Sequence, residues 1–157
     1  MIVEDYVSFE TAKLLKENGF KEWCRCCYGV AVLHNGEDIS FDEECDLKDE
    51  GRENEIEYVE GGAFYYFNCD NSDKDAKVWA APTLQMAMKW LREVHNLHIE
   101  VYRTACGYLY IISKVPTGSD LYDDGDAYDG DDENSGQWTT NEKACEAAIK
   151  YCLHNLI

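Results

Sequence analysis

The chain has 157 residues, with 32 acidic against 14 basic side chains and a formal net charge of -18. This length is enough for one domain with its own hydrophobic core, and a hydrophobic content of 45% excludes a wholly disordered protein. The excess of acid argues against a protein that binds nucleic acid directly, because affinity for the phosphate backbone comes from clustered Lys and Arg. We therefore expect residues 1–157 to form a single domain.

The first predicted element is a helix over about 9–18. Ser8 precedes this segment and can accept a hydrogen bond from the free N–H groups of its first turn. Gly19 follows the segment with a hydrophobic residue behind it, which is typical of a glycine at a helix C-terminus.

A β-hairpin is predicted next. Residues 27–33 are mostly apolar or β-branched, and the pair Asn35-Gly36 behind them is the strongest short signal for a tight hairpin turn. Ile39 and Phe41 then alternate with polar residues. We expect residues 38–42 to pair with the strand 27–33.

The middle of the chain predicts a strand and a second helix. The aromatic-rich segment near 62–68 has strand composition. Pro82 and Thr83 then open a segment in which apolar residues recur at helical spacing, and Asn96 is the expected stop.

The last third predicts a second hairpin and a third helix. Residues 98–104 and 107–115 are β-branched and aromatic and are separated by a short turn. Thr139 lies three residues before Glu142, the spacing of a capping box, for a helix that ends near Leu156. The fold class that follows is α+β, with a mainly antiparallel sheet packed with about three helices.

The negative charge is confined to two segments. Residues 37–60 contain twelve acids and two bases, and residues 117–136 contain eight acids and no base. Their net charges of -10 and -8 equal the whole charge of the chain, so the other 113 residues are neutral. We interpret both segments as acidic insertions in a neutral domain, and the second as a flexible loop because it lacks periodicity.

The expected location is the cytoplasm. Glu4 and Asp5 stand where a secretory signal carries positive charge, and no apolar run approaches the roughly 18 residues that span a bilayer. Without export, the eight cysteines are expected to stay reduced and to act mainly as small core hydrophobes.

Two segments near the C-terminus carry a family resemblance. APTLQMAMKWLREVHN and TTNEKACEAAIKYCLHNLI, together with the opening SFETAKLLKENGF, resemble small uncharacterised proteins of Bacteroidetes and their phages and prophages. The resemblance covers half or more of the chain. It implies an accessory protein of a mobile element in a bacterial cytoplasm, and no catalytic residue.

Metal and catalytic motifs fit the sequence poorly. Structural zinc sites use paired Cys-x2-4-Cys knuckles, and the spacing here does not match. The best calcium-loop register starts at Asp129 but has Asn134 at the glycine position and Thr140 at the final glutamate. His95, in a last helical turn, is interpreted as a cap. We expect no cofactor, no metal and no enzyme activity, since no nucleophile, base and orienting group stand out together. The zinc candidates are Cys24, Cys26, Cys27, Cys45, Cys69 and His34.

Aromatic residues within or beside the acidic segments favour a binding function. Carboxylates attract Arg and Lys of a partner, and rings supply desolvated anchors. We therefore predict a non-enzymatic interaction protein that binds a basic protein surface of a host or defence protein, as a nucleic-acid mimic. The aromatic residues in question are Tyr58, Tyr122, Tyr128 and Trp138. The predicted contact residues are Asp42, Glu43, Glu44, Asp120, Tyr122, Asp123, Asp124, Asp126, Tyr128, Asp129, Asp131, Asp132 and Glu133.

Two alternatives stay open. The first is a module that binds a nucleotide or metabolite near Trp79, Trp90 and Tyr102, although the bases available for a phosphate are scattered in the sequence. The second is a metal-binding protein. The oligomeric state is not predicted.

Overall fold

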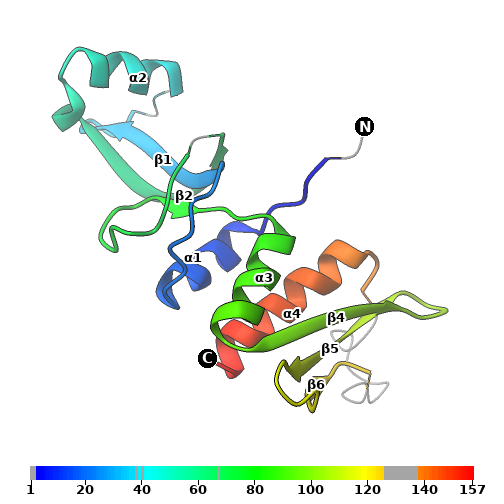
Figure 1. The fold of residues 1–157 in the computed structure, drawn as a ribbon. Coiled ribbons are helices and arrows are strands. Elements are labelled where there is room, and N and C mark those ends of the chain that lie inside the picture. The colour runs from blue at the N-terminus through cyan, green and yellow to red at the C-terminus, as the bar shows by residue number, and fades with distance from the viewer. Residues whose placement is uncertain (1–2, 38, 40, 67, 126–137) are drawn as a thin grey trace.

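The protein, as a computed structural model, consists of a body and a projecting arm (Figure 1). The structure describes residues 3–37, 39, 41–66, 68–125 and 138–157. The helices are α1 (Phe9–Glu17), α2 (Phe41–Asp49), α3 (Leu84–Val94) and α4 (Asn141–Asn155), with one 3-10 turn, η1 (Glu53–Glu55). The strands are β1 (Cys27–Leu33), β2 (Ile56–Tyr65), β3 (Trp79–Ala80), β4 (Leu97–Arg103), β5 (Tyr108–Lys114) and β6 (Asp120–Asp123). The fold is α+β, as predicted, but with four helices in the described residues rather than three.

The body contains an antiparallel sheet of order β4-β5-β6 and the helices α1, α3 and α4. Helices α3 and α4 cover β4, α4 also packs on β5, and α1 packs on α4. Leu91, Ile112 and Ile149 are fully buried where these elements meet. The body core is therefore built from the apolar faces that the helical and strand periodicities predicted.

The predicted hairpin of the body is present. Strand β4 pairs with β5 in continuous register from Leu97 opposite Lys114 to Arg103 opposite Tyr108. Strand β6 pairs with the other edge of β5. The prediction of a loop over 117–136 is thus wrong for β6. These residues form a strand because the edge of β5 offers backbone hydrogen-bond partners to them. Residues 126–137 lie outside the described part of the chain.

Helix α4 begins one residue later than predicted. Its N-cap is Thr140, whose hydroxyl accepts a hydrogen bond from the N–H of Lys143 (3.2 Å). Thr139 instead accepts from the side chain of Lys143. The predicted cap Ser8 is confirmed, because it accepts a hydrogen bond from the N–H of Thr11. Thr83, which was predicted to open the second helix, is the N-cap of α3 and accepts from the N–H of Met86.

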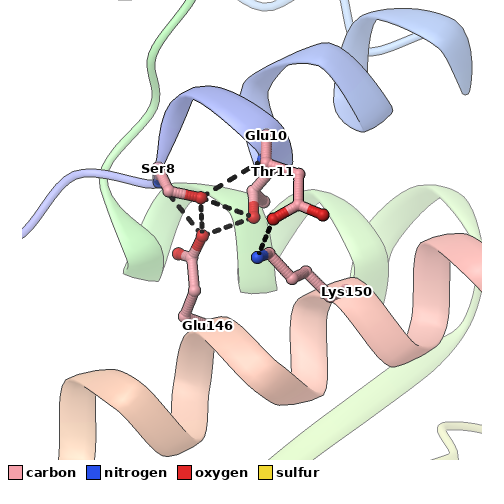
Figure 2. Close-up of polar contacts among 5 residues, drawn as sticks. All are labelled: Ser8, Glu10, Thr11, Glu146 and Lys150. Atoms are coloured by element: carbon pink, nitrogen blue, oxygen red, sulfur yellow. Dashed lines mark hydrogen bonds and ion pairs between the residues drawn. The ribbon is translucent and has the colours of Figure 1, made fainter. Parts of the chain in front are cut away.

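Polar contacts fix α1 to α4 (Figure 2). The Glu146 carboxylate of α4 accepts hydrogen bonds from the Ser8 N–H (3.0 Å), the Ser8 hydroxyl (2.5 Å) and the Thr11 hydroxyl. Beside it, Lys150 donates to Glu10 at 2.5 Å. A negative charge from α4 therefore stands at the positive end of the α1 dipole, where it stabilises that helix end.

The arm is formed by β1, β2 and α2. Strands β1 and β2 pair antiparallel and run away from the body, and α2 lies at their far end (Figure 1). Among the described residues, none between Gly29 and Asn68 belongs to the main hydrophobic core. The short strand β3 pairs with the base of β1 and packs on α1, which joins the arm to the body.

The prediction of a strand over 38–42 is wrong. The chain does turn at Asn35-Gly36, where Gly36 has a φ of 83°, and Ile39 donates a backbone hydrogen bond to Ala31 (3.1 Å). Helix α2 then begins at Phe41. Three acids in its first turn and Lys48 in its last match the helix dipole, which favours helix over continued strand. The strand partner of β1 is β2, which begins at Ile56 rather than near residue 62.

Candidate functional site

A pocket lies beneath α2, at the end of the arm. Its volume is about 280 Å³. Leu33, Ile39 and Leu47 give it an apolar lining, and Ile39 is buried. This volume is at the lower limit of ordinary small-ligand sites and is suited to a single long side chain. We call it the arm pocket.

Acidic side chains surround the arm pocket. Glu43, Asp46 and Glu50 line it, and all three are exposed. Glu43 and Asp46 lie three residues apart on α2, and Glu50 follows one position past its end with its N–H bonded to the Asp46 carbonyl (3.0 Å), so all three lie on one side of the arm pocket. An apolar lining with carboxylates around it matches a Lys or Arg side chain, which has an apolar stem and a charged end.

Arg52 of the chain itself already uses one of these carboxylates. Its guanidinium donates to Glu50 at 3.1 Å and to both oxygens of Glu55 at 2.8 Å. These contacts raise the pKa of Arg52 and lower that of Glu55. Arg52 is thus itself part of the lining of the arm pocket, and its charge is paired with Glu50 and Glu55.

The predicted acidic residues of α2 divide into two groups. Asp42 and Glu43 are exposed, as a contact residue must be. Glu44 is buried and binds Lys48 in the next helical turn at 2.5 Å. Glu44 therefore stabilises the helix and does not offer a free carboxylate to a partner.

The second acidic segment is partly buried. Asp120 is exposed, whereas Asp124 is buried and accepts a hydrogen bond from the indole N–H of Trp138 (3.1 Å). Burial raises the pKa of the Asp124 carboxyl. Asp123 accepts from the N–H of Gly125 (2.8 Å).

The aromatic residues of that segment belong to the packing of the body. Tyr122 stacks on Tyr151 of α4 with ring centroids 3.9 Å apart, and Trp138 packs against the same core. Neither ring is presented as an exposed anchor. The side chain of Tyr58 and six further predicted contact residues lie outside the described residues: Asp126, Tyr128, Asp129, Asp131, Asp132 and Glu133.

Four of the eight cysteines gather at the base of the arm: Cys24, Cys26, Cys27 and Cys69. Cys24 and Cys69 exchange two backbone hydrogen bonds (2.9 and 3.0 Å), and the Cys69 thiol donates to the Cys26 carbonyl (3.6 Å). Burial raises the pKa of Cys24 to about 12. Within residues 3–37, 39, 41–66, 68–125 and 138–157, no three His, Cys, Asp or Glu side chains form a group that could hold a metal ion. The thiols of these four cysteines are buried and packed as core residues, whereas Cys45 is half-buried and Cys106 exposed.

His95 closes α3 as its C-cap, as predicted, but not as a cation. Its ring packs against Trp90 with centroids 4.5 Å apart, and its Nε2 is buried without a hydrogen-bond partner. Desolvation lowers the pKa of His95. The neutral ring therefore contributes packing rather than a charge at the helix end.

Sequence reasoning located the acidic segment but not the arm pocket. Leu33, Ile39 and Leu47 come from β1, the turn and α2, and only the tertiary fold brings them together. The three-and-four spacing of Glu43, Asp46 and Glu50 was the available signal for an acidic helical face.

Comparison with models of protein families, with curated proteins and with solved structures gave no match. Helices that would be long and apolar enough to cross a bilayer are absent from the described parts of the chain. The resemblance to bacteroidete and phage proteins stays a prediction.

Proposed function

We propose that this chain is a non-enzymatic interaction protein whose arm binds a basic protein surface. The observation that carries the proposal is the arm pocket, with its apolar lining and its three exposed carboxylates from Glu43, Asp46 and Glu50. A partner's Arg or Lys would insert its methylene stem against Leu47 and place its charge among the acids.

The spacing of charge on the arm supports mimicry of nucleic acid. Five exposed carboxylates lie between residues 42 and 50: Asp42, Glu43, Asp46, Asp49 and Glu50. At a helical rise of about 1.5 Å per residue they cover about 12 Å, or roughly one charge per 2.5 Å. Duplex DNA carries one charge per about 1.7 Å of its axis. The arm therefore presents a similar line of charge to the nucleic-acid-binding groove of a partner. This is consistent with inhibition of a host or defence protein by a mobile-element protein.

A defined basic probe tests the arm pocket. The binding of a fluorescent arginine-rich peptide is followed by anisotropy for the natural protein and for the variant Glu43→Gln, Asp46→Asn, Glu50→Gln. The matched control neutralises three exposed acids of the body, Glu22→Gln, Glu93→Gln and Glu100→Gln. We expect the arm variant to lose at least about tenfold in affinity and the control far less, with a steep dependence on salt.

Partners are then identified by differential capture. Bacterial lysate is passed over the natural protein, the arm variant and the control variant, and each purified partner is tested for competition with duplex DNA. We expect the natural and control baits to retain proteins that the arm variant does not retain, and duplex DNA to displace these proteins from the natural bait. Equal peptide affinity in the arm and control variants would refute it.

A further inference from the structure

A second pocket, of about 520 Å³, lies between α1 and residues 74–79. Four lysines line it, together with the side chain of Trp79: Lys13, Lys16, Lys74 and Lys77. They are four of the 14 basic residues of the whole chain. We call it the lysine pocket. Its volume lies within the range of pockets that hold nucleotide-sized molecules.

Lys16 gives this pocket a fixed frame. Its buried ammonium group donates to the backbone carbonyls of Ala76 (2.5 Å) and Val78 (2.9 Å), which holds the 74–79 segment against α1. The same ammonium lies 5.6 Å from the ring centre of Trp79. Phe9 packs edge-on against Trp79 at 5.2 Å. The apolar wall of the pocket is therefore held in place before any ligand binds.

Positive charge exceeds negative charge in the lysine pocket. Its carboxylates are Glu17 and Asp75, so the lining has a net charge of +2 (four lysines against two acids). The nearby Asp73 accepts hydrogen bonds from the N–H groups of Asp75 (2.9 Å) and Ala76 (3.3 Å), within its own loop.

The two lysines of the loop are available to a ligand. Lys74 and Lys77 are exposed, and no ion pair joins either of them to another residue in the described part of the chain. In a chain with a net charge of -18, solubility does not explain why several lysines line one pocket, because the acidic segments already provide it.

We propose that the lysine pocket binds a nucleotide-sized organic phosphate. Lys74 and Lys77 would bind the phosphate oxygens, since ammonium groups are effective point-charge partners of phosphate, and Lys13 would add positive charge beside them. The organic part would pack against Trp79. The acidic helix α2 stands at the far end of the arm, away from α1 (Figure 1), and salt screens distant charges beyond about 10 Å at 0.1 M.

Calorimetric titration tests this pocket with four probes: adenosine triphosphate, adenosine monophosphate, adenosine and inorganic tripolyphosphate. The variant is Lys74→Gln, Lys77→Gln, and the matched control is Lys89→Gln, Lys114→Gln, which removes two exposed lysines elsewhere. All four side chains are exposed, so folding is unaffected, and thermal unfolding verifies this.

The triphosphate is expected to bind most tightly and adenosine least. The Lys74, Lys77 variant should lose at least about tenfold in affinity for the triphosphate, and the control should keep the natural affinity. Three results would overturn the proposal: no binding of any probe, equal affinity in the variant and the natural protein, or adenosine binding as tightly as its triphosphate. Tripolyphosphate binding as tightly as the nucleotide would overturn the role of Trp79.

Discussion

Replacement of Glu146 by Ala tests how α1 is held on α4. The substitution removes three hydrogen bonds from one carboxylate, those of the Ser8 N–H, the Ser8 hydroxyl and the Thr11 hydroxyl. A hydrogen bond to a charged group is worth about 1.5–3 kcal/mol, but these three share one half-buried oxygen and do not add fully. Because Thr11 is fully buried, its hydroxyl also loses a partner that water does not replace.

We expect a loss of about 3 kcal/mol in the free energy of unfolding for Glu146→Ala. Glu146→Gln keeps an acceptor oxygen but loses the charge, so it should lose about half as much. The measurement is urea unfolding followed by circular dichroism, and about 3 kcal/mol corresponds to roughly 6–12 °C in melting temperature for a chain of this size.

Glu10, an exposed residue in the same interface as Glu146, provides the control for this experiment. Glu10→Gln breaks the ion pair with Lys150 in the same interface, and we expect no resolvable change because Glu10 is solvent-exposed. The reasoning fails if Glu146→Ala loses less than about 1 kcal/mol, or if the Gln and Ala variants are equally unstable.

Two further predictions concern buried titratable groups. Asp124→Asn should stabilise the protein at pH 7, because burial raises the pKa of this carboxyl and folding therefore disfavours its charged form. The difference in unfolding free energy between the variant and the natural protein should shrink as the pH falls through the raised pKa towards the ordinary value of 3.8. A pH-independent difference in urea unfolding would contradict this prediction. Iodoacetamide should modify Cys106 first in the native protein, since Cys106 is exposed, whereas burial raises the pKa of Cys24 and Cys152 to about 12. Peptide mass spectrometry that finds Cys24 labelled as fast as Cys106 would show this prediction to be wrong.

Local signals predicted the body well. Ser8 is the N-cap that the sequence indicated, α3 begins directly after Thr83 as predicted, and the β4–β5 hairpin occupies nearly its predicted range. These features depend on residues within a few positions of one another, so hydrophobic periodicity and capping chemistry were sufficient to find them.

The arm could not be predicted in the same way. The Asn35-Gly36 turn is real, but after it the dipole-matched charges of α2 favour helix over the two-residue alternation of Ile39 and Phe41. The arm pocket and the Glu146 contacts join residues distant in sequence, and the lysine pocket unites α1 with a loop some 60 positions later. Patterns along the chain do not show which distant segments become neighbours.

The separation of the arm from the body core has a consequence for how this chain tolerates change. Residues between Gly29 and Asn68 add nothing to the main core among the described residues. If the arm binds a partner as proposed, substitutions on α2 would change that binding with little effect on whether the body folds. Binding and folding would then be encoded in different stretches of the sequence, so the arm could diversify under selection while α1, α3, α4 and their sheet stay constant.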